Sequence, residues 1–434
     1  MADELVQLDA RRPLTRAFLV LLLIVATGWS YYAFRWYLGN TLAEYFNADE
    51  NNLEMAQIAQ TLAPNDPLTN WRLAQVLQKK LPLGQEGNAI AEYERAVALA
   101  PNDYRFWMAL GTAREHAGDK ANAETALRQA VSLAPSYAFP RWYLGNLLLR
   151  EGRYDEAFAE LRFASDGDPE LRPQLFNLAW EIYGGDFEAL KNSVGQNPDT
   201  RAEFALYLFT QRGSEDGLRL WNTLPEKEMR ANKVVGNSLI TALVGAKRYL
   251  EAMRTWNYLV PNDFYRAEIG HVIDGGFEEP IEYGASTVFG WQVKNAPQVQ
   301  IGIDPGKAHS GDRSLRFVFQ VRSKIDSLAT SQLVTVAPNT QYDFECYVKT
   351  QKLQTGGPPA IQIFDAASGA GLAQSETAPN GDSDWSRVAL SFKTGEKAEA
   401  VILKIVNTSC GEDLPVCPIF GTVWYDDFSL KRRD

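Results

Sequence analysis

The residues that could carry chemistry are few and scattered. The chain holds three histidines, His116, His271 and His309. None of them belongs to an HExxH metal motif or to a spacing typical of a nucleophile–histidine–acid hydrolase. No P-loop is present, and the run GAGLA at 369–373 lacks the third glycine and the following helix of a dinucleotide site. We therefore predict that the protein is not an enzyme.

Two pairs of acidic residues are the remaining candidates for acid–base chemistry. They are Glu278–Glu279 and Asp426–Asp427. Neighbouring residues on a strand point to opposite faces of the sheet. The two carboxylates of a glycosidase must instead flank one sugar bond. These pairs are therefore not expected to form a hydrolytic site.

The three cysteines are too few for a disulfide-rich scaffold. Cys410 and Cys417 close the short loop CGEDLPVC and would form one disulfide in an oxidising compartment. Cys346 alternates with apolar residues in QYDFECYVK, which predicts a buried strand residue rather than a reactive thiol.

The composition bounds the possible classes of protein. The 434 residues suffice for two or three domains, and a hydrophobic fraction of 45% is typical of folded chains. The formal net charge of -11 argues against a nucleic-acid partner, because nucleic-acid binding needs a basic surface.

The sequence pattern of the last third of the chain predicts β-strands. Short runs with period-two alternation are separated by glycine, proline and asparagine turns, and no helical pattern interrupts them. The runs are SLRFVFQV, SQLVTVAP, TQYDFECYVKT, AIQIFDAAS, SRVALSFKT, AVILKIVN and TVWYDDFSL. This pattern predicts an antiparallel β-sandwich.

The order of the phrases in this region resembles carbohydrate-binding modules of the family 4 and 9 type, which are jelly-roll sandwiches. The matching phrases are DGGFEEP (274–280), FGW (289–291), HSGDRSLRF (309–317), VAPNTQYDFECYVKT (336–350), DW (384–385) and VWYDDFSL (423–430). The resemblance covers residues 270–431. It implies a glycan ligand, although the same sandwich also serves as a protein-binding or spacer module.

The resemblance also implies a structural calcium ion between the opening Gly-Phe-Glu and the closing strand, held by Glu278 and by Asp426 or Asp427. In a regular strand Asp426 shares a face with Phe428 and Leu430. If those two point inward, Asp426 is a buried carboxylate that needs either a cation or backbone amides as partner.

Exposed aromatic rings beside polar side chains would be needed for sugar binding. Trp291, Trp385 and Trp424 are the candidates. Trp291 and Trp385 coincide with packing positions of the resembled modules, so the alternative is that all three are core residues.

The middle of the chain has a 34-residue period. Pro64, Pro101, Pro135 and Pro169 follow one another at spacings of 37, 34 and 34, with helical apolar patterns between them. This region resembles the tetratricopeptide repeat, whose pattern is matched within one unit. The matching residues are Trp107, Leu110, Gly111, Ala123, Leu127 and Pro135. The resemblance is strongest over 67–169 and implies an α-solenoid that binds a segment of a partner protein on its concave face.

The phrase RWYLGN occurs at 35–40 and again at 141–146. The second copy lies in the first helix of a repeat. The first copy ends an apolar run about where another first helix belongs. We therefore expect the apolar helix to continue into the solenoid, the alternative being a chance identity.

A candidate membrane anchor precedes the repeats. Ala17 to Phe34 are 18 consecutive uncharged residues, followed by an aromatic cluster. Arg11, Arg12 and Arg16 precede the run and acidic residues follow it. The positive-inside rule therefore predicts a cytoplasmic N-terminus and an extracytoplasmic bulk, in a bacterium the periplasm or cell surface. A cleaved signal peptide is the alternative, but no clear cleavage site is present.

These observations predict a single transmembrane helix, an α-solenoid and a C-terminal antiparallel β-sandwich. The expected boundaries are a tail at 1–16, an anchor at 17–37, a solenoid at 38–262 and a sandwich at 263–434. The expected function is a non-catalytic scaffold accessory to cell-envelope polysaccharide synthesis or export. The alternative is an assembly subunit of a larger membrane complex, with protein contacts on both domains.

Overall fold

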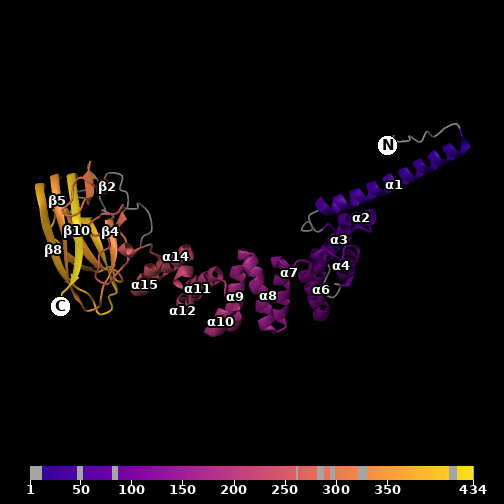
Figure 1. Cartoon of the computed structure of the whole chain (residues 1–434), viewed down its shortest axis with the longest axis horizontal. Coiled ribbons are helices and arrows are strands. Elements are labelled where there is room, and N and C mark those ends of the chain that lie inside the picture. Colours follow the sequence, from indigo (N-terminus) through magenta and orange to yellow (C-terminus); the bar gives the residue numbers. More distant parts are fainter. Residues whose placement is uncertain are drawn as a thin grey trace, which may run out of the picture. The chain divides into compact units, whose positions relative to one another are not determined.

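The computed structural model describes residues 12–45, 52–80, 87–260, 262–280, 288–293, 299–320, 330–409 and 418–433 (Figure 1). The chain divides into two compact units, 1–200 and 201–434, and each is described by itself. Helices occupy the first unit, whereas the second unit has helices followed by strands. This arrangement confirms the predicted fold class of TPR-like helix pairs, one apolar helix and a two-sheet antiparallel sandwich.

The helices of the first unit are consecutive antiparallel pairs. They are α1 (Pro13–Tyr45), α2 (Leu53–Leu62), α3 (Pro67–Lys80), α4 (Gly87–Leu99), α5 (Tyr104–His116), α6 (Lys120–Leu133), α7 (Ala138–Arg150), α8 (Tyr154–Gly167), the 3₁₀ turn η2 (Pro169–Leu171), α9 (Arg172–Tyr183) and α10 (Phe187–Ser193). Within a pair, a glycine of the first helix allows close approach of the second. A Cβ on Gly111 would lie 2.6 Å from Leu127, and one on Gly145 would lie 2.7 Å from Leu161.

Helix α1 contains both the apolar run and the first copy of RWYLGN without a break. Gly39 and Ala43, near its C-terminal end, are buried, and α1 packs against α2 and α3. A Cβ on Gly39 would lie 2.8 Å from the carbonyl oxygen of Ala59. Gly39 thus has the role that Gly111 and Gly145 have in later pairs, which confirms that the apolar helix continues into the repeat array.

The second unit begins with helices, of which α15 packs on the sandwich. They are α11 (Pro198–Arg212), which starts in the first unit, α12 (Asp216–Trp221), α13 (Glu226–Ala231), α14 (Lys233–Gly245), α15 (Tyr249–Leu259) and the 3₁₀ turn η3 (Asp263–Tyr265). The Tyr249 hydroxyl donates to the Ala366 carbonyl at 2.8 Å, and the Leu250 N–H donates to the Glu399 carboxylate at 3.1 Å. The predicted solenoid boundary at 262 therefore falls inside this compact unit, and the domain boundaries stay a prediction.

The sandwich consists of two five-stranded antiparallel sheets, in the orders β1-β4-β9-β6-β7 and β2-β3-β10-β5-β8. The strands are β1 (Gln292–Val293), β2 (Val299–Asp304), β3 (Ser314–Phe319), β4 (Thr330–Thr335), β5 (Gln341–Thr355), β6 (Pro359–Asp365), β7 (Gly371–Gln374), β8 (Gly381–Lys393), β9 (Ala400–Asn407) and β10 (Ile419–Arg432). All seven predicted strands are present, and β1, β2 and β7 were not predicted. Cys346 on β5 is fully buried, as predicted.

A bulge in β10 corrects the predicted facing of its side chains. The pairing of β10 with β5 shifts between Asp426 and Ser429, and Asp427 has a φ of 52°. The extra residue changes the alternation. Val423 and Tyr425 before the bulge, and Phe428 and Leu430 after it, belong to the core. Trp424 and Asp426 therefore lie on the outer face, and the expectation that Asp426 shares a face with Phe428 and Leu430 was wrong.

Candidate functional site

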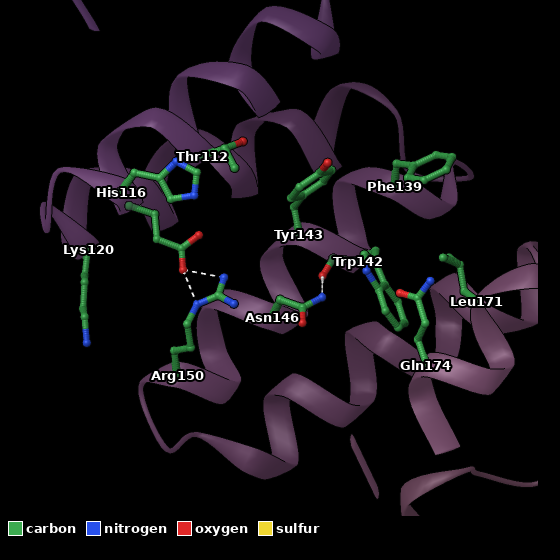
Figure 2. Close-up of a pocket in the computed structure, with 11 residues that line it drawn as sticks. Thr112, His116, Lys120, Phe139, Trp142, Tyr143, Asn146, Arg150, Leu171 and Gln174 are labelled. Carbon is green, nitrogen blue, oxygen red and sulfur yellow. Dashed lines mark hydrogen bonds and ion pairs between the residues drawn. The ribbon is translucent and has the colours of Figure 1, made fainter. Parts of the chain in front are cut away.

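The first unit carries a groove that is a candidate binding site (Figure 2). Its cavity of about 670 Å³ is lined by first helices of successive pairs, α5, α7 and α9, together with the start of α6 and with η2. The lining residues are Thr112, Glu115, His116, Lys120, Phe139, Trp142, Tyr143, Asn146, Arg150, Leu171 and Gln174. Stacked first helices form the inner surface of a solenoid, and the groove lies where the sequence placed the partner-binding face.

The groove has an apolar end and a charged end (Figure 2). Phe139, with 52% of its surface exposed, lies with Trp142 and Leu171 at the apolar end. At the other end the Arg150 guanidinium donates to the Glu115 carboxylate at 2.6 Å, with His116 beside this pair. The sequence did not predict these residues to form one site, because their shared surface forms only when α5, α7 and α9 stack.

Polar side chains in the middle of the groove have unused hydrogen-bonding groups. The Asn146 carboxamide donates one bond to the Trp142 carbonyl at 2.8 Å. Its oxygen and the Tyr143 hydroxyl make no hydrogen bond within the described part of the chain. In an extended segment, every backbone N–H and C=O needs a partner. These side chains could therefore pair with the backbone of a bound peptide.

The two copies of RWYLGN differ in their surroundings. In the second copy, Trp142 is 9% exposed and Asn146 lines the groove. In the first copy, Trp36 is 46% exposed, and the Asn40 carboxamide donates to Asp66 at 3.0 Å. The second copy thus contributes to a groove, whereas the first copy contributes to a contact between α1 and Asp66.

Two of the three tryptophans named as glycan candidates are buried. Trp291 is 5% exposed, packs on Phe277 and Phe428, and donates its indole N–H to the Asp274 carbonyl at 3.0 Å. Trp424 is 2% exposed, although it lies on the outer face. Neither ring offers a free face to a sugar in this structure.

The end of β2 and the loop that follows it cover Trp424. The Lys307 ammonium lies 4.1 Å from the Trp424 ring centroid, and the indole N–H donates to the Asp304 carboxylate at 2.9 Å. Both contacts come from residues that precede Trp424 by more than a hundred positions. The burial of this ring is therefore a property of the folded loop and is invisible in the strand pattern.

Trp385, on β8, is the third candidate and is only partly buried. It lies edge-on to the His309 ring at 5.8 Å, and His309 stacks on Tyr347 with 3.5 Å between centroids. Polar side chains flank it: Lys349 donates to Asp384 at 2.5 Å. This outer-face aromatic cluster, His309, Tyr347 and Trp385, combines the ring surface and the hydrogen-bonding groups that sugars require. His309 and Tyr347 were not identified as site residues from the sequence.

The acidic residues named as calcium ligands converge on the loop at 309–313. Both Asp426 oxygens accept backbone N–H groups, from His309 at 2.7 Å and from Asp427 at 2.8 Å. Asp427 accepts from the Ser310 hydroxyl at 2.6 Å and contacts His309 Nδ1 at 2.6 Å. The bulge thus points both carboxylates toward one loop, which corrects the expectation that this pair would face opposite sides.

Glu278 also binds backbone donors. Its Oε1 accepts the N–H groups of Asp312 at 2.9 Å and Arg313 at 3.3 Å. Among the described residues, no group of three or more acidic, histidine or cysteine side chains is placed to hold a metal ion. This donor set favours backbone amides, the second of the two alternatives for Asp426. Calcium stays a prediction.

Burial raises the pKa of two carboxyl groups here, Asp274 and Asp426, each to about 6. Since the folded state then binds protons more tightly than the unfolded state, its stability increases as the pH falls through 6. We expect the second unit to gain about 1–2 kcal/mol of unfolding free energy between pH 7.5 and pH 5. Chemical denaturation at both pH values, in EGTA, measures this.

The variant Asp426→Asn serves as the control. It should remove roughly half of the pH dependence of the unfolding free energy, because one of the two raised carboxyl groups is then absent. A calcium ion held by Asp426 would lower its pKa instead. In that case EGTA would lower the melting temperature of the wild type at pH 7.5. That result would contradict the backbone-amide interpretation.

The predicted Cys410–Cys417 disulfide lies outside the described residues. Burial raises the pKa of the Cys346 thiol, which fits its predicted inert role. Helix α1 is long and apolar enough to cross a membrane, by its length and composition. An N-terminal signal sequence satisfies the same criterion.

Comparison with known proteins identifies one repeat. A tetratricopeptide repeat model matches residues 104–137, which contain α5 and α6. The prediction of such a repeat is thereby confirmed at this position. No curated protein sequence matches the chain.

Several solved structures are similar to parts of the chain. The MamA protein is 17% identical, covering 42% of this chain and 96% of its own, with a TM-score of 0.33. A CBM4 structure is 14% identical, covering 37% and 99%, with a TM-score of 0.29. The CBM22-1 xylan-binding domain of Paenibacillus barcinonensis Xyn10C is 16% identical, covering 38% and 97%, with a TM-score of 0.26.

Proposed function

We propose that this protein is a membrane-anchored, non-catalytic scaffold. Its repeat groove binds a segment of a partner protein, and its sandwich binds a glycan. The anchor is α1, with the N-terminus in the cytoplasm and the bulk of the chain outside it. The scaffold is accessory to cell-envelope polysaccharide synthesis or export.

The observation that carries the proposal is the groove between α5, α7 and α9. It is lined in part by residues of a tetratricopeptide repeat, a module whose usual role is to bind other proteins. It combines apolar side chains with polar groups that have spare hydrogen-bonding capacity. Ligand sites in proteins combine these two features.

Glycan binding rests on the outer-face aromatic cluster. We expect Trp385→Ala, in the full chain in mild detergent, to weaken binding to a polysaccharide that retains the wild type by roughly three- to tenfold. The reason is that an aromatic contact is worth about 0.5–1.5 kcal/mol. Pull-down against a panel of immobilised bacterial and plant polysaccharides measures this.

Two variants control this experiment. Trp385→Phe keeps a ring and should retain most of the binding. Phe420→Ala removes a 40% exposed aromatic side chain from β10 and should bind as the wild type does. If Trp385→Ala also binds as the wild type does, the cluster is not the glycan site.

The alternative function is an assembly subunit of a larger membrane complex. In its favour, Trp36 and Tyr37 on α1 are 46% and 60% exposed, although their counterparts Trp142 and Tyr143 are covered or line the groove. Such aromatic side chains could pack against another membrane protein. Purification from detergent discriminates: stoichiometric membrane partners favour the complex, and their absence favours the glycan role.

A further inference from the structure

The charged end of the repeat groove is basic, although the protein as a whole is acidic. Its titratable side chains are His116, Lys120, Arg150 and Glu115. The only acid among them, Glu115, is 9% exposed and already bound to Arg150. Lys120 is exposed and makes no ion pair within the described part of the chain. Because Glu115 neutralises Arg150, the excess positive charge at this end of the groove is that of Lys120, in a chain of net charge -11.

The apolar end lies at the other end of α7. Phe139 and Arg150, at the two ends of this helix, are about 16 Å apart along its axis at 1.5 Å per residue. An extended peptide covers that distance with about five residues. Tyr143 and Asn146 lie between the two ends, where they can pair with the backbone of such a peptide (Figure 2).

We propose that the groove binds an extended segment of a partner protein that carries a bulky apolar side chain and, four or five residues away, one or more acidic side chains. The apolar side chain contacts Phe139 and Trp142, and the acidic group faces Lys120 and Arg150. Charge complementarity selects this segment, since a basic segment would be repelled by Lys120. This inference rests on the proposed protein-binding function and names the chemistry of the partner.

A selection experiment tests the specificity. The full chain in mild detergent is used to select from a random seven-residue peptide library displayed on phage. We expect the enriched peptides to combine an aromatic or aliphatic residue with an acid four or five positions away. A synthetic peptide of that consensus should bind the Lys120→Glu variant roughly three- to tenfold more weakly, and binding should weaken with added salt.

Two further variants separate the contributions. Lys227→Glu reverses an exposed charge on α13, outside the groove, and should leave the affinity unchanged. Phe139→Ser removes the exposed apolar contact and should weaken binding without a change in salt dependence.

The possible outcomes separate the preference for acidic segments from the protein-binding function itself. Enriched peptides with neutral or basic consensus sequences, sensitive to Phe139→Ser, would overturn the acidic preference and leave the protein-binding groove intact. If no peptide is enriched, or if binding ignores both groove variants, the proposed protein-binding function fails and this inference fails with it.

Discussion

Replacing Gly275 with alanine should destabilise the second unit strongly. A Cβ at this position would lie 2.1 Å from the carbonyl oxygen of Phe428, and the Phe428 N–H donates to the Gly275 carbonyl at 2.9 Å. Two backbone segments meet here, and neither can rotate away as a side chain would. We expect a loss of about 3 kcal/mol of unfolding free energy, the upper range for overpacking.

The adjacent glycine provides a matched control. A Cβ on Gly276 would meet nothing closer than 3.8 Å, which is ordinary van der Waals contact. Gly276→Ala should therefore melt within a few degrees of the wild type. Gly275→Ala should melt roughly 6–12 °C lower in scanning calorimetry of the full chain. Equal melting temperatures for the two variants would contradict the close approach of the 274–278 turn to β10.

Trp256→Ala should also cost the second unit several kcal/mol. Trp256 on α15 is 9% exposed, packs edge-on to Phe289 at 5.9 Å, and donates its indole N–H to the Tyr265 carbonyl at 2.9 Å. Removing a large buried aromatic side chain typically costs about 3–5 kcal/mol. The loss should appear in the transition of the sandwich, because the ring joins α15 to the segment that leads into it.

Tyr258 on the same helix is the control for this prediction. It is 41% exposed, so Tyr258→Ala should change the unfolding free energy by less than about 1 kcal/mol. Hydrogen exchange should show faster exchange across β4 and β9 for Trp256→Ala only. Unchanged protection of these strands would mean that α15 and the sandwich unfold independently, as the predicted boundary at 262 implies.

Most of the architecture could be predicted from local sequence patterns. Prolines at 34-residue spacing, and small residues such as Gly111 where two helices meet, suffice to predict helix pairs, because helix ends and close approaches depend on neighbouring residues. Period-two alternation in the same way predicted seven strands. The strands that were not predicted are the two-residue β1, the four-residue β7, and β2, which contains a glycine. They are too short or too irregular for a pattern to emerge.

The candidate sites depended on contacts that no local pattern contains. A single bulge at Asp427 moved Trp424 and Asp426 to the outer face, and a loop more than a hundred positions earlier then buried both. The sequence could nominate Trp385 and Trp424 equally, but only the folded loop distinguishes the partly exposed ring from the covered one.

The repeated phrase RWYLGN illustrates the same division. From the sequence we expected both copies to lie in first helices of repeat pairs, with a chance identity as the alternative. The close approach of the following helix to Gly39 and to Gly145 confirms the expectation. Only the tertiary structure decided their roles. Asn40 is bound to Asp66, whereas Asn146 lines a groove formed by α5, α7 and α9. Helix formation responds to near neighbours in the chain, whereas a binding surface is made by side chains that meet only after the helices have stacked.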